Sequence, residues 1–457
     1  MKNIKTKFTT IGLILVFLVT SGASCGVGGG DEKETSKAIT LDYWRVWDGK
    51  DTFDDIINSY KTIHPNVTIK YKKLRYEEYE KELLDAFAEG RAPDIVSLHS
   101  SWLRRYQQKL EPLPPSITMG YPVVKGTLKK ETVIETRTNK SITPAQIKQD
   151  FLDVVYDNAI IEGEIYGLPL SVDSLVLFYN RDLLNVAGIT EAPRYWNETF
   201  LKNVKAMTTE DNDGNLVQSG VALGTSANVQ RYSDILSLLM MQNGAEMLDE
   251  KGNVAFHQKP RMSNKDYAPG LDALRFYTDF ANPLKEVYNW NDSMPDSLSA
   301  FVEGRVAMFF GYAYHLPQIK AQAPRLNFGI SPMLQVEGGH NINFANLWVE
   351  SVSKQSENTD VAWDFIQFAT KAEQAKKFLA KANKPTALRS LVNSQKEDEG
   401  LAVFAEQLLT ATNWYTGNDY NATEIIIGEM IEQALLDPAK IDKAITLGAK
   451  KVQQTIK

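Results

Sequence analysis

The chain has 457 residues, of which 43% are hydrophobic and 23% are charged, a balance typical of globular proteins. Because single hydrophobic cores stop growing at about 250–300 residues, this length predicts two or three domains. The formal net charge is −7 and the sequence shows no basic patch, which argues against nucleic acid as a partner.

The first 24 residues predict a signal peptide. Three lysines (Lys2, Lys5 and Lys7) precede an apolar stretch at residues 11–19, which is shorter than a membrane span of about 20 residues. A positive segment followed by a short apolar one is typical of secretory signals.

The small residues that follow lead to Cys25, and the segment Ser21–Cys25 resembles a bacterial lipobox, although Gly22 stands where leucine is usual. Cys25 is the only cysteine, and its position favours a lipoprotein acylated there over an ordinary secretory signal. Two or more acyl chains give stable anchoring. Residues 25–37, rich in glycine and charge, then predict a flexible tether.

The single cysteine also excludes an intramolecular disulfide and any cysteine-based metal site. The five histidines are scattered, without a pair at the spacing of metal ligands. We therefore expect neither a metal site nor a cofactor.

Strand and helix patterns alternate after the tether. Strands are predicted at residues 39–47, 67–71 and 93–98, with helices at residues 52–64, 76–88 and 102–108. This order predicts a parallel α/β lobe. Ligands bind such lobes beyond the carboxyl ends of the strands, which lie near Trp47–Asp48 and His99–Ser101.

Residues 112–150 have a different composition, first proline-rich and then rich in lysine and threonine, with few apolar residues. Within this stretch, we expect residues 115–150 to form a surface insertion with limited structure, and we assign it no role in binding or catalysis. Further on, Asn212–Asn215 predicts a tight turn between two strands rather than a calcium loop, and the chain from residue 360 is mostly helical.

Five segments resemble the motifs of one family. They are, in chain order, Glu89–Val96, Gly163–Pro169 with its continuation to Leu183, Ala300–Gly311, Ala362–Phe368 and Asn383–Thr386. Together they resemble the family 1 extracellular solute-binding proteins, the maltose-binding-protein-like components of ABC importers. The resemblance covers most of residues 38–390.

This resemblance implies an α/β fold, the two-lobed periplasmic-binding-protein fold (class II-like), with a hinge of crossing segments and a ligand cleft between the lobes. The hinge segments would lie near residues 170–173, 329–332 and 384–386. The N-terminal lobe would combine residues 38–170 and 332–384, and the C-terminal lobe residues 173–329 and 385–457.

A sugar presents hydroxyl groups in a plane and apolar faces on either side, so its cleft needs aromatic rings together with carboxylates, amides or arginine. Positions that match the family's ligand contacts are clearest at Trp47–Asp48, after Asp94, at Asp173 and in the aromatic residues after Gly311. We expect ligand contacts from Trp47, Asp48, His99, Ser101, Trp102, Asp173, Arg231, Tyr232, Tyr312, Tyr314, Trp348 and Trp414.

The resemblance thus implies a solute-binding lipoprotein, a monomer without catalytic residues, that captures a sugar or oligosaccharide and delivers it to the permease subunits of an ABC transporter. Cys25 would hold it at the cell membrane, in an extracytoplasmic location. Two alternatives stay open. One is a binding protein for a peptide or anionic solute, for which Arg45 and Arg231 are the only hints. The other is an extracellular glycoside hydrolase, which needs two carboxylates about 5–9.5 Å apart that the sequence does not single out.

Overall fold

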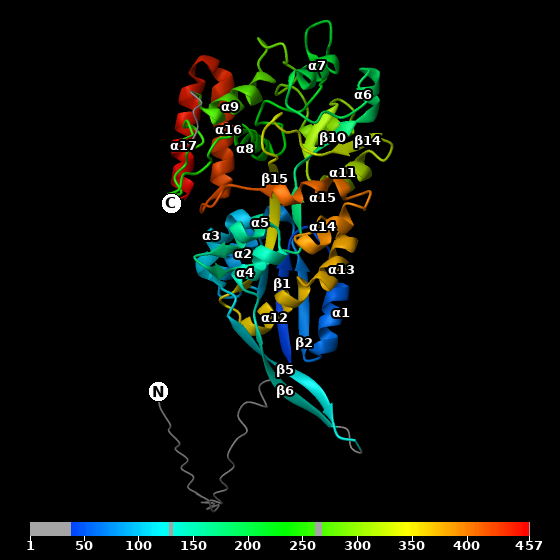
Figure 1. Cartoon of the computed structure of the whole chain (residues 1–457), viewed down its shortest axis with the longest axis vertical. Coiled ribbons are helices and arrows are strands. Elements are labelled where there is room, and N and C mark those ends of the chain that lie inside the picture. The colour runs from blue at the N-terminus through cyan, green and yellow to red at the C-terminus, as the bar shows by residue number, and fades with distance from the viewer. Residues whose placement is uncertain (1–37, 128–130, 261–266, 457) are drawn as a thin grey trace, which may run out of the picture.

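The computed structural model describes residues 38–127, 131–260 and 267–456. The predicted signal peptide, Cys25 and the tether therefore lie outside the described residues. The described chain folds into two α/β lobes that follow one another along the long axis of the molecule (Figure 1). This architecture confirms the expected two-lobed fold.

The first lobe is built on a seven-stranded sheet with the order β16-β15-β3-β1-β2, to which β4 and β9 add at β15. Three parallel strands form its first part: β1 (Ile39–Arg45), β2 (Val67–Lys73) and β3 (Ile95–His99). They are connected by the helices α1 (Asp54–Ile63) and α2 (Tyr76–Ala88). The predicted alternation of strand and helix is therefore correct in this lobe.

A later strand, β15 (Asn343–Ser353), completes this sheet and pairs antiparallel to β3, so that Trp348 lies opposite His99. The other elements around it are α3 (Leu103–Tyr106), β4 (Leu110–Glu111), α4 (Pro144–Asp150), α5 (Asp153–Ala159), β7 (Ile160–Ile161), β8 (Glu164–Ile165), β9 (Val172–Ser174), α12 (Thr359–Ala369), α13 (Ala372–Ala382), α14 (Arg389–Gln395), α15 (Ala402–Gln407) and β16 (Ala411–Thr412).

The second lobe contains a smaller antiparallel sheet of three strands, with β10 (Val176–Asn180) between β13 (Met308–Gly311) and β14 (Phe328–Ser331). Asn180 caps the next helix, because its side-chain oxygen accepts hydrogen bonds from two backbone N–H groups. The predicted turn at Asn212–Asn215 joins β11 (Thr209–Glu210) and β12 (Leu216–Gln218). The helices of this lobe are α6 (Arg181–Val186), α7 (Glu198–Ala206), α8 (Tyr232–Gln242), α9 (Pro269–Asp279), α10 (Ser297–Val302), α11 (His315–Gln322), α16 (Tyr420–Leu436) and α17 (Ile441–Ile456).

The expectation of limited structure for residues 112–150 is wrong. The strands β5 (Ser116–Lys125) and β6 (Glu131–Lys140) pair over ten positions in a long antiparallel hairpin. The few apolar residues suffice because they gather on one face at the base, where Ile117 and Met119 are buried. The threonine-rich sequence that suggested a loop also suits an exposed strand, since β-branched residues fit a pleated surface.

Two separate hydrophobic cores correspond to the two lobes. The first core holds buried residues from Leu41 to Val172 and most of those from Ala345 to Ala411. The second core holds those from Leu175 to Phe344, together with Leu401, Phe404 and the buried residues from Trp414 to Val452. The buried residues therefore change core between Val172 and Leu175, and again between Phe344 and Ala345 within β15.

The later boundaries differ from the predicted division of the lobes. Residues 387–411 pack largely with the first core, because Leu388 pairs with Phe151 and Thr386 with Ser171. We therefore propose that the first lobe combines residues 38–172 and 345–411, and that the final return to the second lobe lies near Trp414.

Candidate functional site

A cavity of about 180 Å³ lies between the two lobes. Its walls combine side chains from both lobes, so neither lobe forms it alone. The lining residues are Trp47, Tyr76, His99, Trp102, Ser171, Asp173, Asn346, Trp348, Lys384 and Pro385 on the side of the first lobe, and Arg231, Tyr314, Tyr420 and Glu424 on the side of the second.

Aromatic rings form much of this wall. Trp47 stacks between Tyr76 and Tyr314, with ring centroids 5.1 Å and 6.0 Å apart. The indole of Trp348 packs edge-on against Trp47 and Trp102, at 6.3 Å and 5.4 Å. Flat apolar surfaces that meet at an angle can contact the faces and edges of a ring-shaped ligand.

The parallel strands explain why distant parts of the first lobe meet here. Trp47 follows β1, and Trp102 follows β3, at the carboxyl edge of one sheet. On β15, Asn346 and Trp348 are two residues apart and therefore project from the same face. Trp47 has a φ of +67°, a left-handed conformation that is unusual for a bulky residue and is often found at functional sites.

His99 is held by neighbours on both ring nitrogens. Nε2 lies 3.1 Å from the Asn346 side-chain oxygen, and Nδ1 lies 2.6 Å from the Ser101 hydroxyl. Burial lowers the pKa of His99 to about 4, and the nearby Arg231 charge acts in the same direction. The imidazole is therefore neutral at pH 7 and offers the cavity a polar edge without charge.

Asp173 lies at the change of lobe, where its carboxylate accepts hydrogen bonds from the backbone N–H groups of Ala313 and Ser174. Burial raises the pKa of this carboxyl to about 7, against the opposing effect of those hydrogen bonds. Asp173 thus joins the two lobes and can accept or donate a hydrogen bond near neutral pH.

Arg231 is fixed by a buried carboxylate behind the cavity wall. Its Nε and Nη2 donate to Asp234 at 2.8 Å and 2.6 Å, and Asp234 also accepts from the hydroxyls of Tyr312 and Tyr420. The Arg231 Nη1 lies 3.9 Å from a Glu424 oxygen. These contacts hold the guanidinium at the cavity surface, where remaining N–H groups can meet a ligand.

Lys384 is held in a similar way from the first lobe. Its ammonium lies 2.8 Å from Asp48, which also pairs with Arg45 at 3.1 Å. Burial lowers the pKa of Lys384, while Asp48 opposes that effect. The cavity therefore carries two cationic groups, Arg231 and Lys384, and two carboxyl groups, Asp173 and Glu424.

The structure brings seven of the sequence-predicted residues to this cavity: Trp47, His99, Trp102, Asp173, Arg231, Tyr314 and Trp348. Ser101 lines a small adjoining hollow of about 20 Å³ with His99. Asp48 faces a larger hollow of about 490 Å³, which shares Trp47, Tyr314 and Lys384 with the cavity and also lies between the lobes.

Three of the predicted residues are placed elsewhere. Tyr232 donates its hydroxyl to the backbone oxygen of Glu424 and lines a groove along α16 and α17. Tyr312 is fully buried and supports Asp234. Trp414 is 7% exposed and packs against Phe256 in the second core. An aromatic residue that is close in sequence to cleft residues can equally pack in the core behind the cleft. No local sequence pattern distinguishes these two positions.

The sequence interpretation missed other residues that line the cavity, including Tyr76, Asn346, Lys384, Tyr420 and Glu424. Two signals were available. Asn346 precedes Trp348 by two residues on a strand, and Tyr420 and Glu424 are four residues apart on a helix, so each pair shares a face. Neither signal says that this face meets the cleft.

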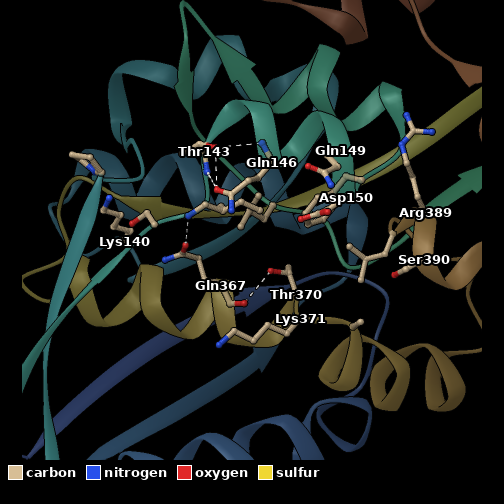
Figure 2. Close-up of a pocket in the computed structure, with 17 residues that line it drawn as sticks. Lys140, Thr143, Gln146, Gln149, Asp150, Gln367, Thr370, Lys371, Arg389 and Ser390 are labelled. Carbon is tan, nitrogen blue, oxygen red and sulfur yellow. Dashed lines mark hydrogen bonds between the residues drawn. The ribbon is translucent and has the colours of Figure 1, made fainter.

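A second concavity of about 550 Å³ lies within the first lobe, between α4, α12 and the start of α14 (Figure 2). Figure 2 shows that its polar side chains bond largely to their surroundings: Thr143 with Gln146, and the Gln367 side-chain oxygen with the backbone N–H of Ile142. No tryptophan or tyrosine is among the described residues that line it. It lacks the aromatic walls of the cavity between the lobes.

No cluster of three or more metal-ligating side chains is found among the described residues. Within those same residues, no helix has the length and apolar character needed to cross a membrane.

Comparison with known proteins gives matching results in sequence and structure. The model of the family described as bacterial extracellular solute-binding protein matches residues 47–376. The maltodextrin-binding protein MdxE of Bacillus subtilis is 24% identical over 428 residues, covering 89% of this chain and 88% of that protein. The galactooligosaccharide-binding protein of the same organism is 21% identical, covering 83% of this chain and 81% of that protein.

Among solved structures, the cyclic α-maltosyl-1,6-maltose-binding protein of Arthrobacter globiformis aligns with a TM-score of 0.72 at 18% identity. The alignment covers 91% of this chain and 98% of that structure. At this identity the likeness concerns the fold, and it agrees with the two-lobed architecture described above.

Proposed function

This chain belongs to the family of bacterial extracellular solute-binding proteins, and we propose that it binds a carbohydrate between its two lobes and delivers it to an ABC importer. The observation that carries the proposal is the aromatic wall shared by both lobes, in which Trp47 and Tyr76 of the first lobe meet Tyr314 of the second. Polar and charged side chains surround these rings, as recognition of sugar hydroxyl groups requires.

An oligosaccharide suits the site better than a single sugar. Two hollows lie between the lobes on a shared boundary, one of about 180 Å³ and one of about 490 Å³, and Trp47, Tyr314 and Lys384 belong to both. Successive sugar rings would occupy the two hollows and stack on the aromatic pair between them. The relatives named above bind maltodextrin and galactooligosaccharide, which supports this class of ligand.

The charges favour a neutral solute over an anionic one. Arg231 and Lys384, the cations of the cavity, are already paired with Asp234 and Asp48. An anion would also meet Asp173 and Glu424, whose carboxyl groups line the same wall. Hydroxyl groups can accept from the cations and donate to the carboxylates at once, so they satisfy both sets of partners.

Ligand capture would follow the closure of the two lobes. A solute that contacts both walls stabilises the closed arrangement by its differential contacts, and the closed form presents a joint surface to the permease. No covalent step is needed. We propose that the solute leaves unchanged, so the protein acts as a binding protein and not as a hydrolase.

The test is a thermal unfolding series of the purified protein with mono- and oligosaccharides, peptides, amino acids and phosphate esters. A ligand at a hundredfold excess over its dissociation constant stabilises the folded form by about 2.7 kcal/mol. A raised melting temperature with one class of oligosaccharide, and recovery of that sugar intact, is the expected result. Stabilisation by peptides or anions alone would refute the carbohydrate assignment, and shorter products would indicate hydrolysis.

We further propose that the protein works as an extracytoplasmic monomer anchored through Cys25. The lipobox-like segment before this residue supports the anchor. Mass spectrometry of the N-terminal peptide from membranes should find Cys25 acylated and residues 1–24 removed. The Cys25→Ser variant should leave the membrane fraction, and continued membrane retention of that variant would argue against this anchor.

A further inference from the structure

Two residues that the second lobe contributes to the cavity wall, Tyr314 and Arg231, come from separate segments of the chain. Tyr314 is the residue directly before α11, and Arg231 is the residue directly before α8. Arg231 also has a left-handed φ of +60°. Both residues therefore lie at the ends of connecting segments, and a fixed distance between them needs side chains that join those segments.

His315, the first residue of α11, makes such a connection. It is 1% exposed and lies behind Tyr314, a lining residue of the cavity. Its Nδ1 lies 2.9 Å from the backbone nitrogen of Tyr312, and its Nε2 lies 3.1 Å from the side-chain oxygen of Gln230. Gln230 directly precedes Arg231, so the imidazole joins the segment of Tyr314 to the segment of Arg231.

The groups at the two ends of this connection fix the direction of each hydrogen bond. A backbone N–H can only donate, so Nδ1 of His315 accepts the N–H of Tyr312 and carries no proton. The amide nitrogen of Gln230 donates to the Asp296 carboxylate at 2.8 Å, which orients the amide oxygen toward Nε2. The imidazole is therefore neutral, with its proton on Nε2. In the other tautomer, Nε2 and the Gln230 oxygen would be two acceptors facing each other.

The surroundings of the ring keep it in this state. Burial lowers the pKa of His315 to about 3, against the opposing effect of the Tyr312 backbone. The ring centroid lies 4.2 Å from that of Tyr314, and a Cβ added at Gly311 would lie 2.8 Å from Nδ1. The imidazole therefore holds Tyr314 by ring contact as well as through the backbone.

We propose that His315 is a positioning residue of the binding site. Through Gln230, it holds Tyr314 at a fixed distance from the segment of Arg231. This inference rests on the proposed function, because it assigns the connection a part in binding carbohydrate. The buried imidazole acts through Tyr314 and not by contact with the solute. Since Tyr314 stacks on Trp47 of the first lobe, loss of the connection should disturb that stack even in the ligand-free protein.

The experiment compares two variants that break the connection from opposite ends. Gln230→Leu removes the acceptor of Nε2 and leaves the imidazole in place. In His315→Asn, the amide oxygen can still accept the N–H of Tyr312, but the side chain is too short to bond Gln230 as well. The matched control is Tyr277→Phe, which removes a buried hydrogen bond elsewhere in the second lobe, from the Tyr277 hydroxyl to the backbone oxygen of Thr225 at 2.9 Å.

The first measurement is fluorine NMR of the ligand-free protein labelled with fluorotryptophan, in which Trp47→Phe identifies the Trp47 resonance. We expect this resonance to shift or broaden in both variants and to stay as in wild type in the control. Combining Gln230→Leu with His315→Asn should add nothing to the effect of His315→Asn, because both changes break one connection. An unchanged Trp47 resonance in Gln230→Leu, or an equal change in Tyr277→Phe, would overturn the proposal.

The second measurement is nitrogen NMR of the histidine side chains, in which His315→Asn identifies the His315 signals. We expect a proton on Nε2 and none on Nδ1 at both pH 5 and pH 8. A proton on Nδ1, or titration of the ring between these two pH values, would overturn the proposed arrangement.

The third measurement is the affinity of each protein for the mono- and oligosaccharides of the thermal unfolding series. For the carbohydrate that stabilises wild type most, affinity should fall about three- to tenfold in both variants and not in the control, which is the value of one displaced aromatic contact. Unchanged affinity in Gln230→Leu would overturn the positioning role. If no carbohydrate stabilises wild type, the proposed function fails, and the Trp47 resonance still decides whether His315 holds Tyr314.

Discussion

Trp47 and Tyr314 belong to different lobes, yet their rings stack with centroids 6.0 Å apart and planes 13° from parallel. Trp47 enters this stack from a left-handed backbone position directly after β1. Both residues line the cavity and also the larger hollow at Asp48. The stack therefore makes an aromatic residue part of both the ligand site and the contact between the lobes.

Replacement of Trp47 by alanine should lower the affinity for the carbohydrate about tenfold or more. The loss combines one stacking contact of about 0.5–1.5 kcal/mol with the apolar area that the ligand no longer buries. Isothermal titration would measure it. Tyr195→Ala is the control, because Tyr195 is 45% exposed and lies outside the cavity. Equal affinities in the two variants would contradict the role of Trp47.

Asp173 should make the protein less stable as the pH rises from about 4 to 7. Its pKa in the folded protein is raised to about 7, above the ordinary value of 3.8, so the folded state holds the proton more tightly than the unfolded state. Stability associated with this proton is present below pH 4 and is lost by pH 7. Asp173→Asn should remove this dependence and raise the stability at pH 8 by about 1 kcal/mol or more.

Thermal unfolding of both proteins at pH 5 and pH 8 would measure this effect. Asparagine can still accept the N–H of Ala313 through its side-chain oxygen, so the variant tests the charge and retains the hydrogen bond. If the difference between wild type and variant is the same at both pH values, the raised pKa is not present in the folded protein.

Arg231→Ala should destabilise the second lobe by about 2–3 kcal/mol. Asp234 is only 1% exposed on its side chain and would lose its cationic partner, although the hydroxyls of Tyr312 and Tyr420 remain. Removing one member of a buried ion pair costs about 3–5 kcal/mol, and the partial exposure of Arg231 reduces that figure.

The double variant Arg231→Ala with Asp234→Asn tests the cause of that destabilisation. Because asparagine needs no counter-charge, the double variant should recover part of the stability lost in the single one, as measured by the melting temperature. If the double variant is instead the sum of two independent losses, the ion pair is not the reason.

Trp414→Ala should reduce stability and leave ligand affinity unchanged in the folded protein. Trp414 is 7% exposed and packs in the second core, and large-to-alanine changes of this kind cost about 3–5 kcal/mol. Unfolding and titration together separate the two effects. A variant that folds as well as wild type but binds the sugar weakly would restore Trp414 to the site, as the sequence had suggested.

The parts of the fold that were predicted correctly depend on patterns within short stretches of the sequence. The strands and helices from β1 to β3 follow from residue periodicity. The hairpin at residues 116–140 was missed because a lysine- and threonine-rich segment resembles a loop when its partner strand is unknown. A strand is stabilised by pairing with a second segment, and the composition of one segment does not show whether such a partner exists.

By itself the sequence determined the family resemblance, the alternation of elements, and the placement of Trp47, His99 and Trp102 at strand ends, because these depend on local order along the chain. Only the tertiary structure decided which aromatic residues face the cavity. Tyr420 lines it and Trp414 does not, although they are six residues apart. The reason is physical: periodicity tells which side chains share a face, whereas the packing of the two lobes decides whether that face meets a cleft or a core.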